Sequence, residues 1–233
     1  MVVKGFGRGA FTPLLLSWKV SVALTAGLLL SACSHQDNLP SFTSTGYLAD
    51  RGAVRIWRKE TSGGNTHIMA AFSPLSDDDT TIGDYRWHDD KLTLLELNMA
   101  GKAPQQIKIR FAENGELSFM QRQANGQKEQ LSEDQIALYL YRARQIKEVS
   151  DALRIGRVVL HQGRWKGNNL ITTCEGASVV APFDTASVRF IERRQNNSTV
   201  PVSLAWLEAP EGTQLLLVAN EDFCTWQPKA EDF

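Results

Sequence analysis

The residues whose types could do chemistry are densest in one acidic stretch near the middle of the chain. They are Asp77, Asp78, Asp79 and Asp84, followed by the triplet His88-Asp89-Asp90. Carboxylates beside an imidazole can hold zinc or calcium. The spacing is not that of an EF-hand, because Ile82 stands where that loop requires glycine. Since Asp favours turns, we expect His88, Asp89 and Asp90 to form a solvated turn, with a metal site there as the alternative.

The other reactive side chains do not follow a known catalytic pattern. The four histidines lie at positions 35, 67, 88 and 161, and no two share a short metal-ligand spacing. His67 and Met69 have the residue types of a copper(I) pair, but residues at i and i+2 of a strand simply face one side. We therefore expect no enzyme, no catalytic residue and no cofactor. A hydrolytic cleft around His88 or His161 is the alternative, because catalytic triads assemble in space.

The first 33 residues have the order of a secretory signal. Three bases, Lys4, Arg8 and Lys19, precede an apolar run over 20–30. An uncleaved anchor over 11–32 is the alternative, but it would place Lys19 near mid-bilayer at a cost of about 2.5–3.5 kcal/mol. We therefore expect a signal peptide over 1–32.

The end of this run, Leu30-Ser31-Ala32-Cys33, resembles a bacterial lipobox. The resemblance implies that the Cys33 thiol receives a diacylglyceryl group and that the signal is cut before it. Acyl chains such as these anchor a protein stably to a membrane. Ser34, in place of Asp, implies passage to the outer membrane, with the chain on its periplasmic face. The polar segment 33–45 is then expected to be a tether.

The composition excludes several classes of protein. With 233 residues, 42% hydrophobic, 22% charged and a net charge of -1, the chain is neither disordered nor a multispanning membrane protein. Loss of the three signal-peptide bases from 25 basic residues, against 26 acidic ones, leaves a net charge of -4. We therefore expect no nucleic-acid partner.

Two further cysteines, Cys174 and Cys224, lie near the ends of strand-like runs. An even pair in an oxidising compartment favours a disulfide, and closing a loop of this length stabilises the fold by about 4 kcal/mol. A redox or copper-binding thiol pair is the alternative, but there is no C-x-x-C spacing and no basic neighbour.

Hydrophobic periodicity indicates strands, one helix, then strands. A β-meander is expected over 46–130, with strands near 46–50, 53–59, 66–72, 85–88, 91–98 and 106–112. Ser132 and Gln135 form a capping box that begins a helix over 131–156. Its apolar stripe consists of Ile136, Leu140, Ala143, Ile146, Val149 and Leu153. Further strands are expected near 157–162, 168–174, 187–193, 202–207 and 213–219.

These elements predict an α+β fold that is mostly antiparallel β, with one long central amphipathic helix and a disulfide-closed C-terminal β portion over 157–233. We expect 46–233 to be one cooperative unit, in which the helix buries its stripe against one set of strands and closes the end of the other. Large aromatic residues could line a ligand cleft, but most are expected in the core. They are Trp57, Trp87, Trp165, Trp206, Trp226, Tyr139 and Tyr141.

Three stretches and the cysteine pair resemble the YjaH-type uncharacterised lipoproteins of Gram-negative bacteria. The stretches read TGYLADRG over 45–52, LSFMQRQ over 117–123 and APEGTQLLLV over 209–218. The resemblance supports an envelope location and implies no activity.

The sequence therefore predicts an outer-membrane lipoprotein that acts as a non-catalytic binding or envelope-assembly module, with an envelope protein or a hydrophobic ligand as its partner. A lipid or amphiphile carrier with the helix as its lid is the alternative, by fold-level analogy with half-barrel lipoprotein carriers. A metal-binding or hydrolytic periplasmic protein is the second alternative. An exposed aromatic patch would indicate an assembly module, an apolar cavity under the helix a carrier, and a convergent polar cleft a hydrolase.

Overall fold

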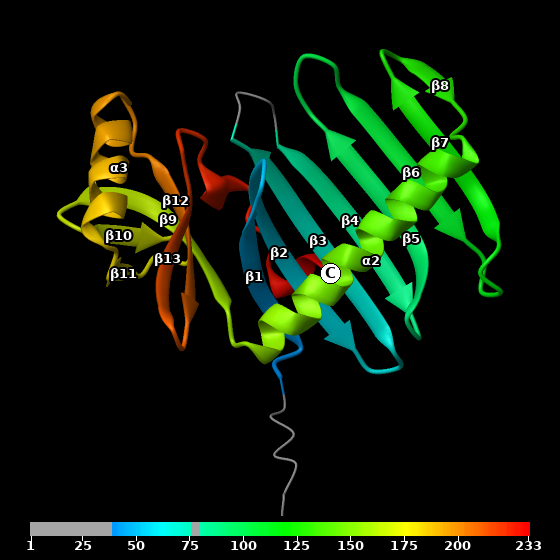
Figure 1. Cartoon of the computed structure of the whole chain (residues 1–233), viewed down its shortest axis with the longest axis horizontal. Coiled ribbons are helices and arrows are strands. Elements are labelled where there is room, and N and C mark those ends of the chain that lie inside the picture. Colours follow the sequence, from blue (N-terminus) through cyan, green and yellow to red (C-terminus); the bar gives the residue numbers. More distant parts are fainter. Residues whose placement is uncertain (1–38, 76–79) are drawn as a thin grey trace, which may run out of the picture. The chain divides into compact units, whose positions relative to one another are not determined.

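The computed structural model describes residues 39–75 and 80–233, in which two antiparallel sheets pack together (Figure 1). The first sheet has eight strands in chain order. These are β1 (Phe42–Ala49), β2 (Gly52–Thr61), β3 (Asn65–Pro74), β4 (Thr81–His88), β5 (Lys91–Met99), β6 (Gln105–Phe111), β7 (Leu117–Ala124) and β8 (Gln127–Glu129). The predicted meander is confirmed. It begins earlier than expected, because Phe42 to Thr45, assigned to the tether, pair with β2.

Two-residue turns of the expected composition set the register of neighbouring strands. Asn125 and Gly126 join β7 to β8 with φ angles of 51° and 77°. Asp89 and Asp90 join β4 to β5 with φ angles of 45° and 62°. Asn, Asp and Gly are the residues that adopt positive φ most readily, and turns of this kind match the twist of the strands.

The central helix, α2 (Glu133–Ile155), begins with the predicted capping box. The Ser132 side chain accepts a hydrogen bond from the Gln135 backbone, and the Gln135 side chain accepts one from the Ser132 backbone. The helix crosses one face of the eight-stranded sheet (Figure 1). We call this the helix-covered face; Val54 and Ile56 of β2 lie on it, whereas Ala53, Arg55 and Trp57 lie on the opposite face.

The second sheet has five strands in the order β11-β10-β9-β12-β13. They are β9 (Val159–Gly167), β10 (Leu170–Thr173), β11 (Ser178–Val180), β12 (Ser203–Ala209) and β13 (Gly212–Ala219). The strand expected near 187–193 is wrong, because α3 (Thr185–Asn196) occupies this segment. Asp184 caps the helix, and Ser187, Ile191 and Gln195 are its more buried residues at i, i+4 spacing. The protein thus has two α-helices within the described residues.

The two sheets contact each other directly, mainly through β1 and β9. Arg55 is fully buried at this junction and donates hydrogen bonds to Gln162 of β9 at 2.7 Å and to Ser73 at 3.0 Å. Its guanidinium lies 4.2 Å from the ring centre of Phe223 in the C-terminal segment, which contains η1 (Phe223–Thr225) and η2 (Ala230–Asp232). Burial lowers the Arg55 pKa to about 10, so the side chain stays charged at neutral pH.

A disulfide joins Cys174, just after β10, to Cys224 in η1. This bridge is the predicted one, and it fastens the C-terminal segment to the second sheet. The mostly antiparallel α+β fold with a disulfide-closed C-terminal portion is therefore confirmed.

Candidate functional site

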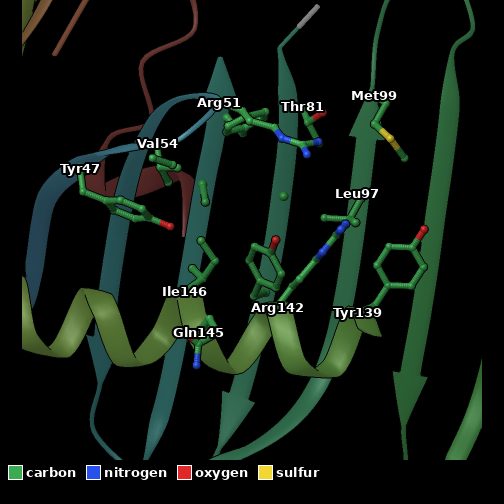
Figure 2. Close-up of a pocket in the computed structure, with 15 residues that line it drawn as sticks. Tyr47, Arg51, Val54, Thr81, Leu97, Met99, Tyr139, Arg142, Gln145 and Ile146 are labelled. Atoms are coloured by element: carbon green, nitrogen blue, oxygen red, sulfur yellow. The ribbon is translucent and has the colours of Figure 1, made fainter. Parts of the chain in front are cut away.

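The space between α2 and the helix-covered face contains a cavity of about 510 Å³ (Figure 2). Its floor consists of apolar residues of β2 to β5, including Val54, Phe72, Leu97 and Met99. Side chains of α2, among them Ile146, form the wall. A cavity of this size lies within the roughly 300–1,000 Å³ typical of small-molecule sites.

Small residues in the sheet give the cavity its depth. In the row that crosses the sheet at this level, Ala70 pairs with Gly83, and Gly83 pairs with Leu97. The ring of Tyr85 lies over Gly83, because a Cβ added at that glycine would be only 2.6 Å from the ring. Hence β3 and β4 contribute no bulky side chain of their own at this level, and the Tyr85 ring forms the floor above Gly83.

The helix packs less deeply on the sheet than its apolar stripe predicts. Among the stripe residues only Ala143 is buried, at 1% exposure, whereas Ile136, Leu140 and Leu153 are half-buried. Ala143 marks the closest packing of helix and sheet. A second cavity of about 540 Å³, lined by Trp87, Leu92 and Leu140 among others, lies beside the same part of the helix.

A polar network attaches the C-terminal half of the helix to the sheet. Arg58 of β2 bonds Asp151 at 2.5 Å and the buried Ser150 at 3.3 Å. Arg154 bonds Glu60 of β2 at 2.8 Å. Burial alone would raise the Glu60 pKa, but hydrogen bonds and charge from Arg154 and Arg58 outweigh it and lower that pKa. Polar groups therefore hold the C-terminal end of the helix to β2, in addition to the apolar packing at Ala143.

Two cations, Arg51 and Arg142, and three tyrosines, Tyr47, Tyr85 and Tyr139, give the cavity its polar groups. Arg51 enters from the β1–β2 turn, and Arg142 extends from α2 toward the sheet (Figure 2). Burial raises the Tyr85 pKa to about 12; Tyr47 adds to this rise and Arg142 opposes it. Burial also raises the Tyr47 pKa. Both phenols are therefore neutral hydrogen-bonding groups at physiological pH.

The histidine and acidic residues that the sequence analysis considered as a metal site do not line the cavity beneath α2. His88, Asp89 and Asp90 are at the β4–β5 turn, where Asp90 pairs with Lys147 of α2 at 2.9 Å and His88 bonds Asn65 at 2.9 Å. Asp77, Asp78 and Asp79 lie outside the described residues, as does Cys33. Within 39–75 and 80–233, no three His, Cys, Asp or Glu side chains gather as a metal-binding group.

The remaining histidines have structural neighbours. His67 lies on the opposite face of the first sheet, bonds Asp84 at 2.9 Å and packs against the ring of Phe233. His161 of β9 stacks on Trp206 and pairs with Glu208 at 3.3 Å. Neither His88 nor His161 is among the residues that line the cavities described here.

The aromatic residues are mostly core, as expected. Trp57, Trp87, Trp165 and Trp206 are at most 4% exposed, and Trp226 is half-buried against Trp57. Tyr141 is exposed, whereas Tyr139 lines the cavity. Thus the tryptophans do not build an exposed aromatic patch within the described part of the chain.

The sequence did not single out Tyr47, Arg51, Tyr85 or Arg142 as site residues. Tyr47 and Arg51 stand in the stretch TGYLADRG, and Arg142 stands one residue before the buried Ala143. Only the strand register, which places Tyr85 over Gly83 near them, joins these residues into a site. In the described residues, no helix has both the length and the apolar character needed to cross a bilayer.

Comparison with known proteins identifies relatives along the whole chain. Residues 44–229 match the family described as "Protein of unknown function (DUF1481)". The chain is 54% identical over 232 residues to the uncharacterized protein YjaH of Escherichia coli (strain K12), an alignment that covers 99% of this chain and 100% of the relative. No solved structure matches. Since the family match spans most of the chain, the protein belongs to the DUF1481 family.

Proposed function

We propose that this protein is a non-catalytic, lipid-anchored envelope protein that binds an amphiphilic ligand in the cavity beneath α2. The observation that supports the proposal is the apolar cavity of about 510 Å³ between the helix and the sheet. The described residues also form a polar pocket of about 350 Å³ with Glu60, Asp90 and Lys147 in its lining, but neither His88 nor His161 lines it, so it lacks the group that the hydrolase alternative requires.

The ligand is expected to be at least partly apolar because of the residues that it would contact. Val54, Phe72, Leu97 and Met99 expose carbon or sulfur surface to the cavity. Burial of apolar surface releases about 25 cal/mol per Å². A chain of methylene groups is therefore the ligand portion that this floor favours, while the tyrosines and arginines suit a polar head.

The lipid anchor remains a separate part of the proposal and rests on the sequence. Cys33 follows Leu30-Ser31-Ala32, and a short polar segment precedes β1. Anchoring through Cys33 at the periplasmic face of the outer membrane would hold the cavity near a bilayer, from which amphiphiles exchange. No nucleic-acid partner is proposed.

Binding of a neutral apolar fluorophore, N-phenyl-1-naphthylamine, to the purified protein tests the cavity. Ala70→Leu fills the floor and should weaken binding, because Ala70 is buried and lines the cavity. Ala137→Leu makes the same change on the exposed side of α2 and serves as the control. Equal loss of binding in both variants, or saturable binding that Ala70→Leu leaves unchanged, would contradict the site.

A further inference from the structure

We propose that the amphiphile bound beneath α2 carries one anionic head, a carboxylate or a phosphate, which Arg51 and Arg142 hold together, while a single chain lies along the apolar floor. This inference rests on the proposed function and specifies the class of ligand.

Among the described residues, Arg51 and Arg142 have no anionic partner. Within 39–75 and 80–233, no carboxylate lies within 4.0 Å of either guanidinium. Arg58, Lys147 and Arg154, the cations that attach α2 to the sheet, are all paired with carboxylates. Arg51 and Arg142 thus keep their hydrogen-bond donors available at the cavity, and a guanidinium fits a carboxylate or phosphate in a two-bond geometry.

The first and second cavities, both lined by residues near the middle of α2, differ in their charged groups. The described residues that line the first cavity include Arg51 and Arg142 and no Asp or Glu. The second cavity has Lys91, Arg144 and Lys147, but Asp90 and Glu148 lie among them. Counted over the described residues, charge in the second cavity is therefore largely balanced, whereas the first has an excess of positive charge that an anionic ligand would neutralise.

The residues of the cavity floor form successive rows across the sheet, and the row nearest Arg51 is where a polar head would lie. Phe72 pairs with Thr81, and Thr81 pairs with Met99, in the row nearest the β1–β2 turn that bears Arg51. Ala70, Gly83 and Leu97 form the next row. Tyr47 lies in the first row as well, because it pairs with Val54 and Val54 pairs with Phe72. A head held by Arg51 at this row could accept a further hydrogen bond from the neutral Tyr47 phenol, and its chain would extend over the second row.

The size of the cavity favours one chain. A methylene group occupies roughly the liquid volume of one water molecule, about 30 Å³, so a cavity of about 510 Å³ suits one alkyl chain with its head. Two chains would need the second cavity as well, and Ala143, at 1% exposure, is packed where helix and sheet meet.

The test compares three ligands with the same twelve-carbon chain: dodecanoate, dodecyl phosphate and dodecanol. Each displaces N-phenyl-1-naphthylamine from the full mature chain at pH 7.5. We expect one of the anions to bind at least about tenfold more tightly than the neutral alcohol, since hydrogen bonds to charged groups are stronger than those between neutral groups. The tighter of the two anions identifies the head as a carboxylate or a phosphate.

The double variant Arg51→Gln/Arg142→Gln should bring the anions to the affinity of dodecanol and leave dodecanol itself within about twofold. Arg144→Gln, on the same helix but at the second cavity, should leave the affinity of each anion relative to dodecanol unchanged. Dodecanol binding as tightly as both anions would overturn the anionic head while leaving the proposed function in place. Loss of the preference in Arg144→Gln alone would also overturn it. Failure of all three ligands and of the fluorophore would overturn the proposed function itself.

Discussion

Because position 83 is a glycine, the Tyr85 ring can lie close to the sheet at the cavity floor. The Tyr85 ring occupies the space where a side chain at Gly83 would lie, with ring and hydroxyl atoms 2.6 to 2.8 Å from an added Cβ. Because the ring is only 7% exposed, it cannot move without disturbing the cavity floor or the core.

Gly83→Ala should therefore reduce the free energy of unfolding by about 1–3 kcal/mol, the usual cost of overpacking, and weaken fluorophore binding because the ring is pushed into the cavity. Urea denaturation gives the first quantity. The control is the same substitution in a Tyr85→Leu background, where it should cost less; equal costs in the two backgrounds would show that the ring is not the obstacle.

Lipidation of Cys33 is a second prediction at the scale of single residues. Cys33→Ser should abolish incorporation of radiolabelled palmitate and signal cleavage, because the thiol is the proposed acceptor of the lipid. Cys174→Ser provides the matched control and should leave labelling intact. Persistent labelling of the Cys33 variant would assign the anchor to another site.

At the scale of elements, α2 is held by two different kinds of contact. Ala143 and its half-buried neighbours pack on the sheet, whereas Ser150, Asp151 and Arg154 bind β2 through polar groups. The helix is predictable from Ser132, Gln135 and the apolar stripe, since these signals are local. The partial burial of the helix cannot be predicted from the sequence, because it depends on small residues of β3 and β4 that the strand register brings side by side.

The helix α3 illustrates the opposite difficulty. The sequence predicts a strand over 187–193, but Asp184 caps a helix in this segment and Ile191 is its one fully buried residue. A short segment can fit both the helical period of 3.6 residues and the strand period of two residues. Packing against the surrounding structure then decides whether it forms a helix or a strand. The pairing of Arg51 and Arg142 at the cavity could not be predicted from the sequence either, because the two residues are 91 positions apart.

The network at the end of α2 predicts a pH dependence. The pKa of Glu60 is lowered below its ordinary value of 4.5. Glu60 therefore stabilises the fold above the unfolded-state pKa, and this contribution is lost as pH falls from about 4.5 through the lower folded-state pKa.

Glu60→Gln should accordingly lose less stability than the parent protein between about pH 5 and pH 3 in urea titrations. Glu192→Gln, an exposed residue of α3, is the control and should follow the parent. Parallel pH profiles for the parent and Glu60→Gln would show that the ion network does not hold the helix.

For the whole molecule, the disulfide and Arg55 connect the C-terminal segment to both sheets. Cys224 bridges to Cys174 of the second sheet, and Phe223 packs on Arg55 of the first. Residues 39–233 form one compact unit by their contacts, and unfolding in a single transition remains a prediction.

Reduction of the bridge should lower the free energy of unfolding by about 2–5 kcal/mol, because the unfolded chain gains the freedom of a 50-residue loop. Denaturation with and without reductant measures this change, and the double variant Cys174→Ala/Cys224→Ala, insensitive to reductant, is the control. An unchanged transition would show that the C-terminal segment is held by packing alone.

Ligand placement beneath α2 is tested most directly by photolabelling of the full mature chain with a twelve-carbon fatty acid that carries a diazirine on its chain. Peptide mass spectrometry then locates the label. The account predicts labels on the cavity residues Leu97, Met99 and Ile146, suppressed by excess unlabelled dodecanoate. Labels concentrated instead on the exposed residues Val180 and Phe190 of the second sheet and α3, or labels that dodecanoate does not suppress, would contradict it.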